Sequence, residues 1–437
     1  MSLFATLTTA GSGLGVSSLT IGVLGDNISN LSTVGFKQNR ASFADFLPQD
    51  VAGISGPSTY GTGAGTYDIS IMFAQGALES STNSLDMAIS GDGFFMVNDG
   101  TADFYTRNGM FYLADDGFIV NANGDTLQGY NADQGNLTTI VSDLSVDTSS
   151  LPQRATTEVI MKATLDSETE FDSTPISDGT YVMDGNTDTI ESIADDSDFA
   201  TSVTVYDSLG QAHELTICYE KTSETEWSWF ALVDGGELGG TDEMAFVVSQ
   251  GTMEFDSDGY LSDFTQTNTS ATTPWNFTGA ASGDLTFDFG FDGSEFTEGD
   301  VRQVAAESAL TSVSQDGYST GTLAGVSVAA DGIISGQYSN GEELILGQVV
   351  LAKFESNAGL ERAGETLYWA RPEAGDPAIG APGTGGRGDI TGFALEASNV
   401  DLENQFVQLI RAQRSYQAAS RVVGTADEAL TELVNLV

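Results

Sequence analysis

Apolar residues recur at alternating steps of four and three at both ends of the chain. One row runs from Leu3 to Leu31 and the other from Leu402 to Val437, each with polar interruptions. A seven-residue apolar repeat is typical of helices that pack along one stripe. The pattern predicts coiled-coil-like helices over residues 1–32 and 395–437. The stripe positions that define this predicted seam are Leu14, Ile21, Leu24, Ile28, Leu31, Leu402, Phe406, Leu409, Tyr416, Val423, Leu430 and Val434.

Each stripe has two possible partners. An amphipathic helix most often covers the core of its own domain, and this interpretation stays open for both ends. Two features favour packing between copies of the chain instead. Glycines between Gly11 and Gly25 each weaken an isolated helix by up to about 1 kcal/mol relative to alanine, so this helix needs partners. Chain ends are also where docking onto other subunits is sterically easiest. We therefore interpret the stripes as a polymerisation seam and expect both ends to be disordered in the monomer.

The first helix is expected to end between Leu31 and Gly35. Polar and β-branched residues precede Gly35, which suits a left-handed position after a helix. The residues that follow are rich in Gly, Ser, Pro and Thr and show no sustained period. The sequence predicts an extended, irregular connector over residues 33–69.

The middle of the chain has the pattern of β-structure. Alternating or β-branched runs, such as residues 94–98, 202–207 and 214–220, are separated by Asp-Gly and Asn-Gly pairs that favour tight turns. The fold class predicted is α+β, mostly β, with terminal coiled-coil-like helices and nested β-domains. Residues 70–150 and 301–394 are assigned to an inner discontinuous β-domain. Residues 151–300 are assigned to an outer, inserted, acidic β-domain that resembles a barrel or sandwich.

Charge excludes some classes of partner. The chain has 63 acidic and 14 basic residues and a formal net charge of -49, which repels nucleic acid and anionic membranes. The outer domain has only Arg154, Lys162 and Lys221 as basic residues. No unbroken run of about 18 apolar residues occurs, which argues against membrane insertion. The N-terminus has no basic residue ahead of its apolar stretch, unlike a cleaved secretory signal.

Candidate chemistry is sparse, and we expect no catalytic residue, cofactor or metal. The single cysteine, Cys218, excludes an intramolecular disulfide. His213, the only histidine, is expected to be a surface residue of a strand rather than a general base. Asp256 to Gly259 resembles the start of a calcium loop but lacks the later bidentate Glu, so a hairpin turn is the better interpretation. The acidic run Asp195 to Asp198 is expected to be a solvated loop.

A motif at the end of the first helix resembles a known family. Residues 26–37 read DNISNLSTVGFK, similar to the signature shared by the axial proteins of the bacterial flagellum, namely rod, hook and hook-associated subunits. This chain has Asp26, Ser29 and Ser32 where the usual pattern has Asn, Ala and Asn. The positions that match are Asn27, Ile28, Asn30, Thr33, Gly35, Phe36 and Lys37.

Longer stretches resemble hook proteins in particular. Residues 85–130 resemble the first half of the inner domain that hook and rod subunits share. Residues 201–222 resemble the core of the hook outer domain, which shorter rod subunits lack. Residues 314–354 and 380–436 resemble the returning half and the C-terminal helix.

The resemblance implies a non-enzymatic subunit of the hook, a curved tubular universal joint that transmits motor torque to the filament. It implies export by the flagellar type III route without a cleaved signal peptide, and an extracellular location in the flagellum. The implied partners are further copies of the chain, rod, hook-cap and hook-filament junction proteins, and the export apparatus. Two alternatives stay open: a distal rod subunit, which shares the motif, and a secreted carbohydrate-binding β-protein.

Overall fold

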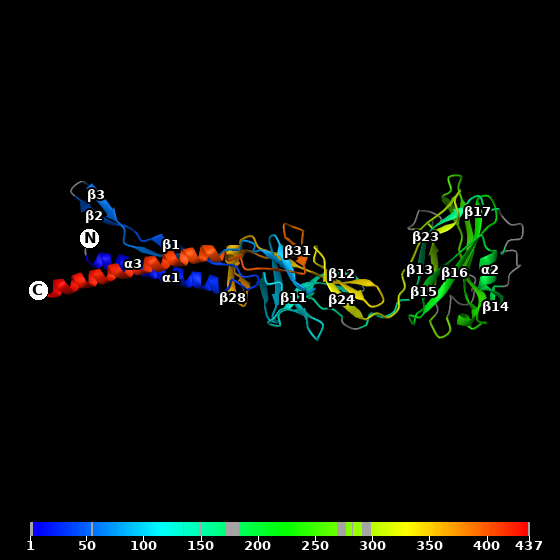
Figure 1. Ribbon diagram of the computed structural model, residues 1–437, viewed down its shortest axis with the longest axis horizontal. Helices are drawn as coiled ribbons and strands as arrows, with labels where there is room; N and C mark the ends of the chain where they lie inside the picture. The colour runs from blue at the N-terminus through cyan, green and yellow to red at the C-terminus, as the bar shows by residue number, and fades with distance from the viewer. Residues whose placement is uncertain are drawn as a thin grey trace. The chain divides into compact units, whose positions relative to one another are not determined.

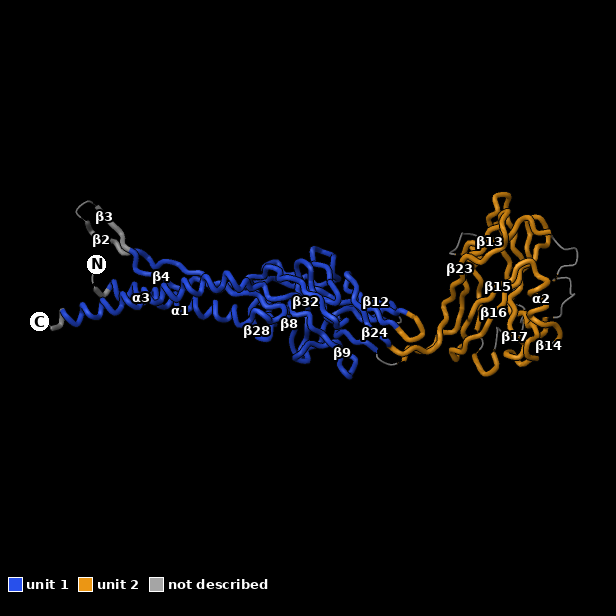
Figure 2. The backbone as a smooth tube through the Cα atoms, in the orientation of Figure 1, with its two compact units in different colours: residues 1–148, 324–337, 343–437 blue, residues 149–323, 338–342 orange. Residues whose placement is uncertain are grey.

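The computed structural model describes residues 3–53, 56–133, 135–147, 150–170, 176, 183–268, 277–281, 283–290 and 299–435. The chain divides into two compact units (Figure 2). Unit 1 comprises Met1–Thr148, Ala324–Gln337 and Glu343–Val437, and unit 2 comprises Ser149–Leu323 and Tyr338–Glu342. The fold is mostly β with helices at the chain ends, as the sequence predicts.

Two long helices of unit 1 lie side by side (Figure 1). They are α1 (Leu3–Ser29) and α3 (Leu402–Asn435). Each supplies the other with an intramolecular partner, so our premise that the terminal stripes lack one is wrong. Residues Ala5–Ser29 of α1 also have the length and mean hydropathy, 1.3, of a helix that could cross a membrane. The prediction from unbroken apolar runs missed this because glycines and hydroxyl residues lower hydropathy only slightly.

The segment after α1 is more regular than expected. Strand β1 (Asn39–Asp45) pairs antiparallel with β4 (Ala64–Ile71), and both strands contact α1. Between them, β2 (Gln49–Gly53) pairs with β3 (Gly56–Tyr60). The residues that we expected to form an irregular connector are therefore largely hairpin, because strands need alternation over only a few positions and the glycines obscured it.

The β-part of unit 1 is built on a branched antiparallel sheet. Its main path runs β24–β25–β26–β11–β7–β8–β29–β28. The strands are β7 (Phe94–Asn98), β8 (Asp103–Thr106), β9 (Tyr112–Leu113), β10 (Ile119–Val120), β11 (Thr126–Asp133), β12 (Asn136–Asp143), β24 (Leu323–Val328), β25 (Ile333–Tyr338), β26 (Glu343–Val349), β27 (Leu351–Lys353), β28 (Leu360–Gly364), β29 (Leu367–Ala370) and β30 (Ala378–Gly380).

Two short strand pairs bring the returning chain beside the first half of unit 1. Strand β31 (Asp389–Gly392) pairs with β6 (Met87–Ser90), and β32 (Ala394–Glu396) pairs with β5 (Leu78–Ser80). A core of aromatic and aliphatic side chains underlies this part, including Phe94, Tyr105, Phe354 and Tyr368. The predicted strand over residues 94–98 coincides with β7, whose first four residues are buried.

Unit 2 contains two sheets. One is formed by β13 (Glu158–Asp166), β21 (Thr286–Asp288), β22 (Asp300–Val304) and β23 (Ala309–Gln315). The other is formed by β14 (Asp184–Thr189), β15 (Phe199–Tyr206), β16 (Ala212–Lys221), β17 (Glu226–Asp234), β18 (Met244–Phe255), β19 (Leu261–Phe264) and β20 (Thr267–Asn268).

Alternation along the strands gives unit 2 two cores. On β16 and β17, Tyr219, Trp227 and Trp229 enter a core shared with β13 of the other sheet. Their neighbours Cys218 and Phe230 point to the opposite face, where helix α2 (Ile190–Asp196) covers them. Successive side chains of a strand alternate between faces, so both faces of these strands are apolar.

Unit 2 extends beyond the boundary placed at residue 300. Strands β22 and β23 both pair with β13, which carries the chain to Leu323 before unit 1 resumes. The predicted boundary rests on the density of carboxylates, and charge indicates solvent exposure rather than strand pairing. His213 is also a correction: it lies on β16 as expected but is buried, 4% exposed.

Candidate assembly surface and helix junction

The motif after α1 forms the junction between the helix pair and the strands. Asn27 is buried and donates from Nδ2 to the carbonyl of Asn39 (2.9 Å) and to Oε1 of Gln405 on α3 (3.2 Å). Its Oδ1 accepts from the backbone N–H of Asn39 (2.8 Å). One amide therefore links α1, β1 and α3. Such a residue is costly to replace, because the buried Gln405 and the half-buried Asn39 would each lose hydrogen bonds.

The next motif residues shape the turn that leaves the helix. Asn30 donates from Nδ2 to the carbonyl of Asp26 (2.9 Å), and Thr33 Oγ1 donates to Asn30 Oδ1 (3.2 Å). Gly35 has φ +70°, in the left-handed region predicted for it. A Cβ at Gly35 would lie 2.5 Å from the backbone nitrogen of Asn108, so only glycine fits both the conformation and the space. Ile28 is half-buried.

Lys37 ends the motif in a buried ion cluster. Its Nζ lies 2.6 Å from Oε1 of Glu396, whose Oε2 lies 3.2 Å from Nη1 of Arg107. All three side chains are at most 5% exposed. Glu396 also accepts from the backbone N–H of Gly76 at 2.7 Å, and Arg107 donates to the carbonyl of Gly91 at 2.7 Å. The cluster links Lys37 to Arg107, in the part of unit 1 that precedes unit 2 in the chain, and to Glu396, in the part that follows it.

Burial and charge act in opposite directions on the two cations. Burial lowers the pKa of Lys37, and Glu396 opposes this while Arg107 adds to it. Burial likewise lowers the pKa of Arg107, and Glu396 again opposes it. One carboxylate thus stabilises two buried cations, which makes Glu396 the residue on which the cluster depends.

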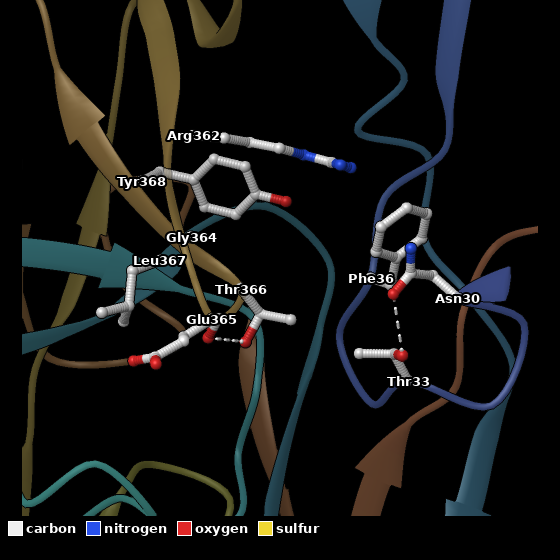
Figure 3. A pocket seen from close by; sticks show the side chains of 9 residues that line it. All are labelled: Asn30, Thr33, Phe36, Arg362, Gly364, Glu365, Thr366, Leu367 and Tyr368. Carbon is white, nitrogen blue, oxygen red and sulfur yellow. Dashed lines mark hydrogen bonds between the residues drawn. The ribbon is translucent and has the colours of Figure 1, made fainter. Parts of the chain in front are cut away.

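Phe36 lines a small pocket of about 210 Å³ beside this cluster. Figure 3 shows Arg362 of β28 extending toward Phe36, and its guanidinium carbon lies 4.4 Å from the ring centroid. Arg362 also donates to the carbonyl of Lys37. The pocket lies between the motif turn and the β28–β29 hairpin, and cation–π stacking closes the motif against that hairpin.

The predicted seam residues divide between two faces of the helices. Leu24 is buried, while Leu14, Ile21, Ile28 and Leu31 are half-buried. On α3, Leu409, Val423 and Leu430 are half-buried, whereas Leu402, Phe406 and Tyr416 are 38%, 46% and 42% exposed. The side chain of Val434 lies outside the described residues.

The row of α3 that is covered is shifted from the predicted one. Its members are buried or half-buried and follow steps of four and three, apart from one step of seven that passes over the exposed Tyr416; they are Gln405, Leu409, Ala412, Ala419, Val423, Ala426 and Leu430. Alanines occupy three positions of this row, and α1 approaches closely at one of them: a Cβ at Gly13 would lie 3.8 Å from Ala419 Cβ. A search for large apolar residues finds Leu409, Val423 and Leu430 but misses the alanines and Gln405.

Several large apolar residues of α3 remain exposed. Besides Leu402, Phe406 and Tyr416, they are Val407, Ile410 and Val422, which are 49%, 50% and 41% exposed. Exposed apolar residues of this size on one helix are candidates for an interaction surface. We call Leu402, Phe406, Val407, Ile410 and Val422, which lie off the covered row, the outward face of α3.

The described residues contain no group of three or more His, Cys, Asp or Glu side chains placed to hold a metal ion. His213 lies between Glu237 (Nδ1 to Oε2, 2.7 Å) and Asp207 (Nε2 to Oδ2, 3.4 Å) and stacks on Phe277 at 3.5 Å. Asp256 accepts from the backbone N–H groups of Asp258 and Tyr260, which makes a turn between β18 and β19. These contacts are structural in kind.

Comparison with known proteins accounts for nearly the full length. The family model described as flagellar hook protein FlgE/F/G D1 domain matches residues 88–163. The models for the flagellar basal body protein FlaE D2 domain and the flagellar basal body rod FlgEFG protein C-terminal match residues 170–318 and 392–436. The flagellar hook protein FlgE of Escherichia coli is 34% identical over 431 residues, covering 97% of this chain and 98% of its own. The chain belongs to the flagellar hook protein family.

Other hook proteins agree with this assignment. FlgE of Rhizobium meliloti is 30% identical over 448 residues and covers 100% of both chains. The crystal structure of Helicobacter pylori flagellar hook protein FlgE2 shares the fold at 15% identity, with a TM-score of 0.50 over 73% of this chain and 100% of that one. The chain is thus a structural subunit of the flagellar hook, and neither the distal-rod nor the carbohydrate-binding alternative is favoured.

The ion cluster is the functional feature that the sequence pattern did not reveal. Lys37 was selected by the motif, but Arg107 and Glu396 were not, and Glu396 is 359 positions away from Lys37. A lone acidic residue at the end of a short strand, as Glu396 is in β32, carries no local signal. The available clue is that Lys37 directly follows Phe36 at the end of the motif and needs a counter-charge if it is buried.

Proposed function

We propose that copies of this chain polymerise through their terminal helices, with the outward face of α3 forming the contact between copies. The observation that carries this proposal is the exposure of its large apolar side chains, which lie off the row of α3 that α1 covers. Covering such residues stabilises association by about 25 cal/mol per Å² of apolar area. In this arrangement residues 1–32 and 395–437 form the inner core of a tube.

Unit 2 is proposed to be the outer, solvent-facing layer of that tube. The carboxylates of neighbouring copies repel one another, which keeps the copies from adhering. Any exposed charge pairs between copies contribute only about 0 to 1 kcal/mol each. Such a layer slides at low cost, while interlocked helices resist slip. A compliant shell over a stiff core is suited to a curved universal joint that transmits torque.

The remaining assignments follow from the family. Rod, hook-cap and hook-filament junction proteins are the proposed neighbours at the ends of the polymer. Export through the flagellar type III apparatus, without a cleaved signal peptide, is the proposed route to the extracellular hook. Nucleic acid is not a proposed partner, given the net charge of -49, nor is membrane insertion of α1, which packs on α3.

The test is a single charge placed on the outward face. Phe406→Asp buries an unpaired carboxylate in every contact between copies, because no basic residue lies three or four positions away from it, so the sedimentable fraction should fall to near background. Ser415→Asp, at an exposed polar position of the same helix, is the matched control and should polymerise normally. The monomers should have equal thermal stability, because Phe406 is 46% exposed in the single chain. Normal polymerisation of Phe406→Asp would refute the proposed contact.

A further inference from the structure

Phe393 combines a strained backbone with an exposed aromatic ring. Its φ is +54°, in the left-handed region, where a Cβ is disfavoured and a bulky side chain is unusual. Glu365 and Thr366 also have positive φ, but they form the tip of the β28–β29 hairpin, where such angles are common. Phe393 lies between β31 and β32, where the chain runs on from one strand into the next. A hairpin therefore does not account for the strain at Phe393.

The strand pairs on either side of Phe393 impose this conformation. Its carbonyl accepts from the backbone N–H of Ser81 at 2.7 Å, and the backbone N–H of Ala394 donates to the carbonyl of Asp86 at 3.4 Å. Glycine adopts a positive φ without a steric cost, yet the chain has its glycine one position earlier, at Gly392. The backbone thus explains the conformation at position 393 but not the presence of phenylalanine there.

Core packing does not explain the phenylalanine either, because Phe393 is 45% exposed. Met110, also 45% exposed, lies nearby. The carbonyl of Gly109 accepts from the backbone N–H of Met87 at 3.0 Å, and Met87 pairs with Gly392 in the β6–β31 ladder. Only one strand therefore separates the two exposed residues. Large apolar residues that are exposed close together are candidates for an interaction surface.

We propose that Phe393 contacts a second copy of this chain in the polymer, and that this contact is the reason for a phenylalanine at a strained position. The inference rests on the polymerisation proposed above and adds a contact made by the β-part of unit 1. Backbone strain is characteristic of sites where function requires a particular side chain.

The small size of the surface indicates a second copy rather than an independent partner. A stable pair in solution needs about 800 Å² of buried surface on each partner, far more than two half-exposed side chains provide. A small surface contributes when other contacts already hold the molecules together, as they do for copies within a polymer. Neighbouring copies in a helical polymer are related by a screw operation rather than a two-fold axis, so the ring meets a different surface of the next copy.

The test compares two truncations of the same side chain, Phe393→Gly and Phe393→Ala. Both remove the ring, so both should raise the critical concentration for polymerisation by about tenfold. Only glycine relieves the strain, so the unfolding equilibrium constant of the Phe393→Gly monomer should be about threefold or more below that of Phe393→Ala. A purely structural role would instead make the more stable Phe393→Gly polymerise better than Phe393→Ala.

Thr366→Gly is the matched control. It also relieves a positive φ but removes no aromatic ring, so it should polymerise at the critical concentration of the unmodified chain. Normal polymerisation of both Phe393 variants would overturn the inference. Phe406→Asp tests the α3 contact separately: if it prevents polymerisation while the Phe393 variants polymerise normally, only the inference about Phe393 fails.

A photo-cross-link identifies the molecule that the side chain at position 393 meets. In a Cys218→Ala background, Phe393→Cys is labelled with benzophenone maleimide and copolymerised with an excess of the unmodified purified chain. Irradiation should produce covalent dimers in the polymer and none in the monomer. Labelled polymers that yield no dimers would show that position 393 does not meet a second copy.

Discussion

At the scale of single residues, the junction depends on one buried carboxylate. Glu396 is fully buried and lies between Lys37 and Arg107, while the sequence motif identified only the lysine. A buried ion pair adds little net stability when complete, but removing one partner leaves charges that water cannot reach. The motif lysine therefore acts as one member of a buried ion cluster that stabilises the fold.

We expect Glu396→Gln to lower the free energy of unfolding by about 3 to 5 kcal/mol, because two buried cations lose the carboxylate that both of them contact. The glutamine keeps the size of the side chain, so the effect reports charge rather than packing. Urea unfolding followed by circular dichroism measures it. Glu361→Gln is the control: it removes an exposed pair with Arg371, 51% and 57% exposed, and should cost at most about 1 kcal/mol. An equal loss of unfolding free energy in the two variants would contradict a special role of the buried cluster.

Cys218 gives unit 2 a dependence on alkaline pH. Burial raises the pKa of its thiol to about 11, above the usual 9.0. The unfolded chain therefore loses this proton first, so the contribution is fully present below pH 9 and is lost as the pH rises through 11. At pH 10.5 the loss should reach about 2 kcal/mol.

The measurement compares the chain with Cys218→Ala from pH 8 to 10.5. The difference in unfolding free energy between the two should shrink by about that amount, because only the unsubstituted chain carries the buried thiol. Thiol reagents at neutral pH should also label Cys218 only after unfolding. A difference that stays constant with pH would show that the thiol is solvated.

At the scale of elements, the two helices show what a heptad pattern does and does not specify. The pattern correctly predicts helices at both ends, since only a helix brings residues three and four apart onto one face. It does not say which face meets which partner. On α3 the row against α1 is built on Ala412, Ala419 and Ala426, whereas the larger Phe406 and Ile410 remain outside.

The strands of unit 2 show a similar limit. Alternation along β16 and β17 is clear in the sequence, and both runs were predicted as strands. Pairing of β22 and β23 with β13 is not visible locally, because it joins residues well over a hundred positions apart. That pairing extends unit 2 to Leu323.

At the scale of the whole molecule, the division into units guides a deletion. Replacing residues 149–323 by a short Gly-Ser linker removes unit 2 at its observed limits, apart from the five residues from Tyr338 to Glu342. Because α1 and α3 both belong to unit 1, we expect the shortened chain to polymerise into tubes visible by electron microscopy. Cells that carry it should swim poorly, since the outer layer is missing.

Deleting residues 151–300 instead is the informative comparison. It leaves β22 and β23 without their partner β13, and unpaired strands promote aggregation. That variant should yield insoluble protein rather than tubes. If the deletion at 149–323 gave soluble, exported monomers that never polymerise, unit 2 would have to contribute to assembly.

The sequence by itself determined the two terminal helices, the strand-and-turn character of the middle, the glycine at the motif turn and the flagellar family. These features depend on local periods and on single-residue conformational preferences, which a linear pattern contains. The tertiary structure decided which row of α3 meets α1, how far unit 2 extends, and that Lys37, Arg107 and Glu396 form one buried cluster. These features depend on contacts between residues far apart in the chain, and a residue's own neighbours do not specify which distant side chain will neutralise its charge or cover its apolar surface.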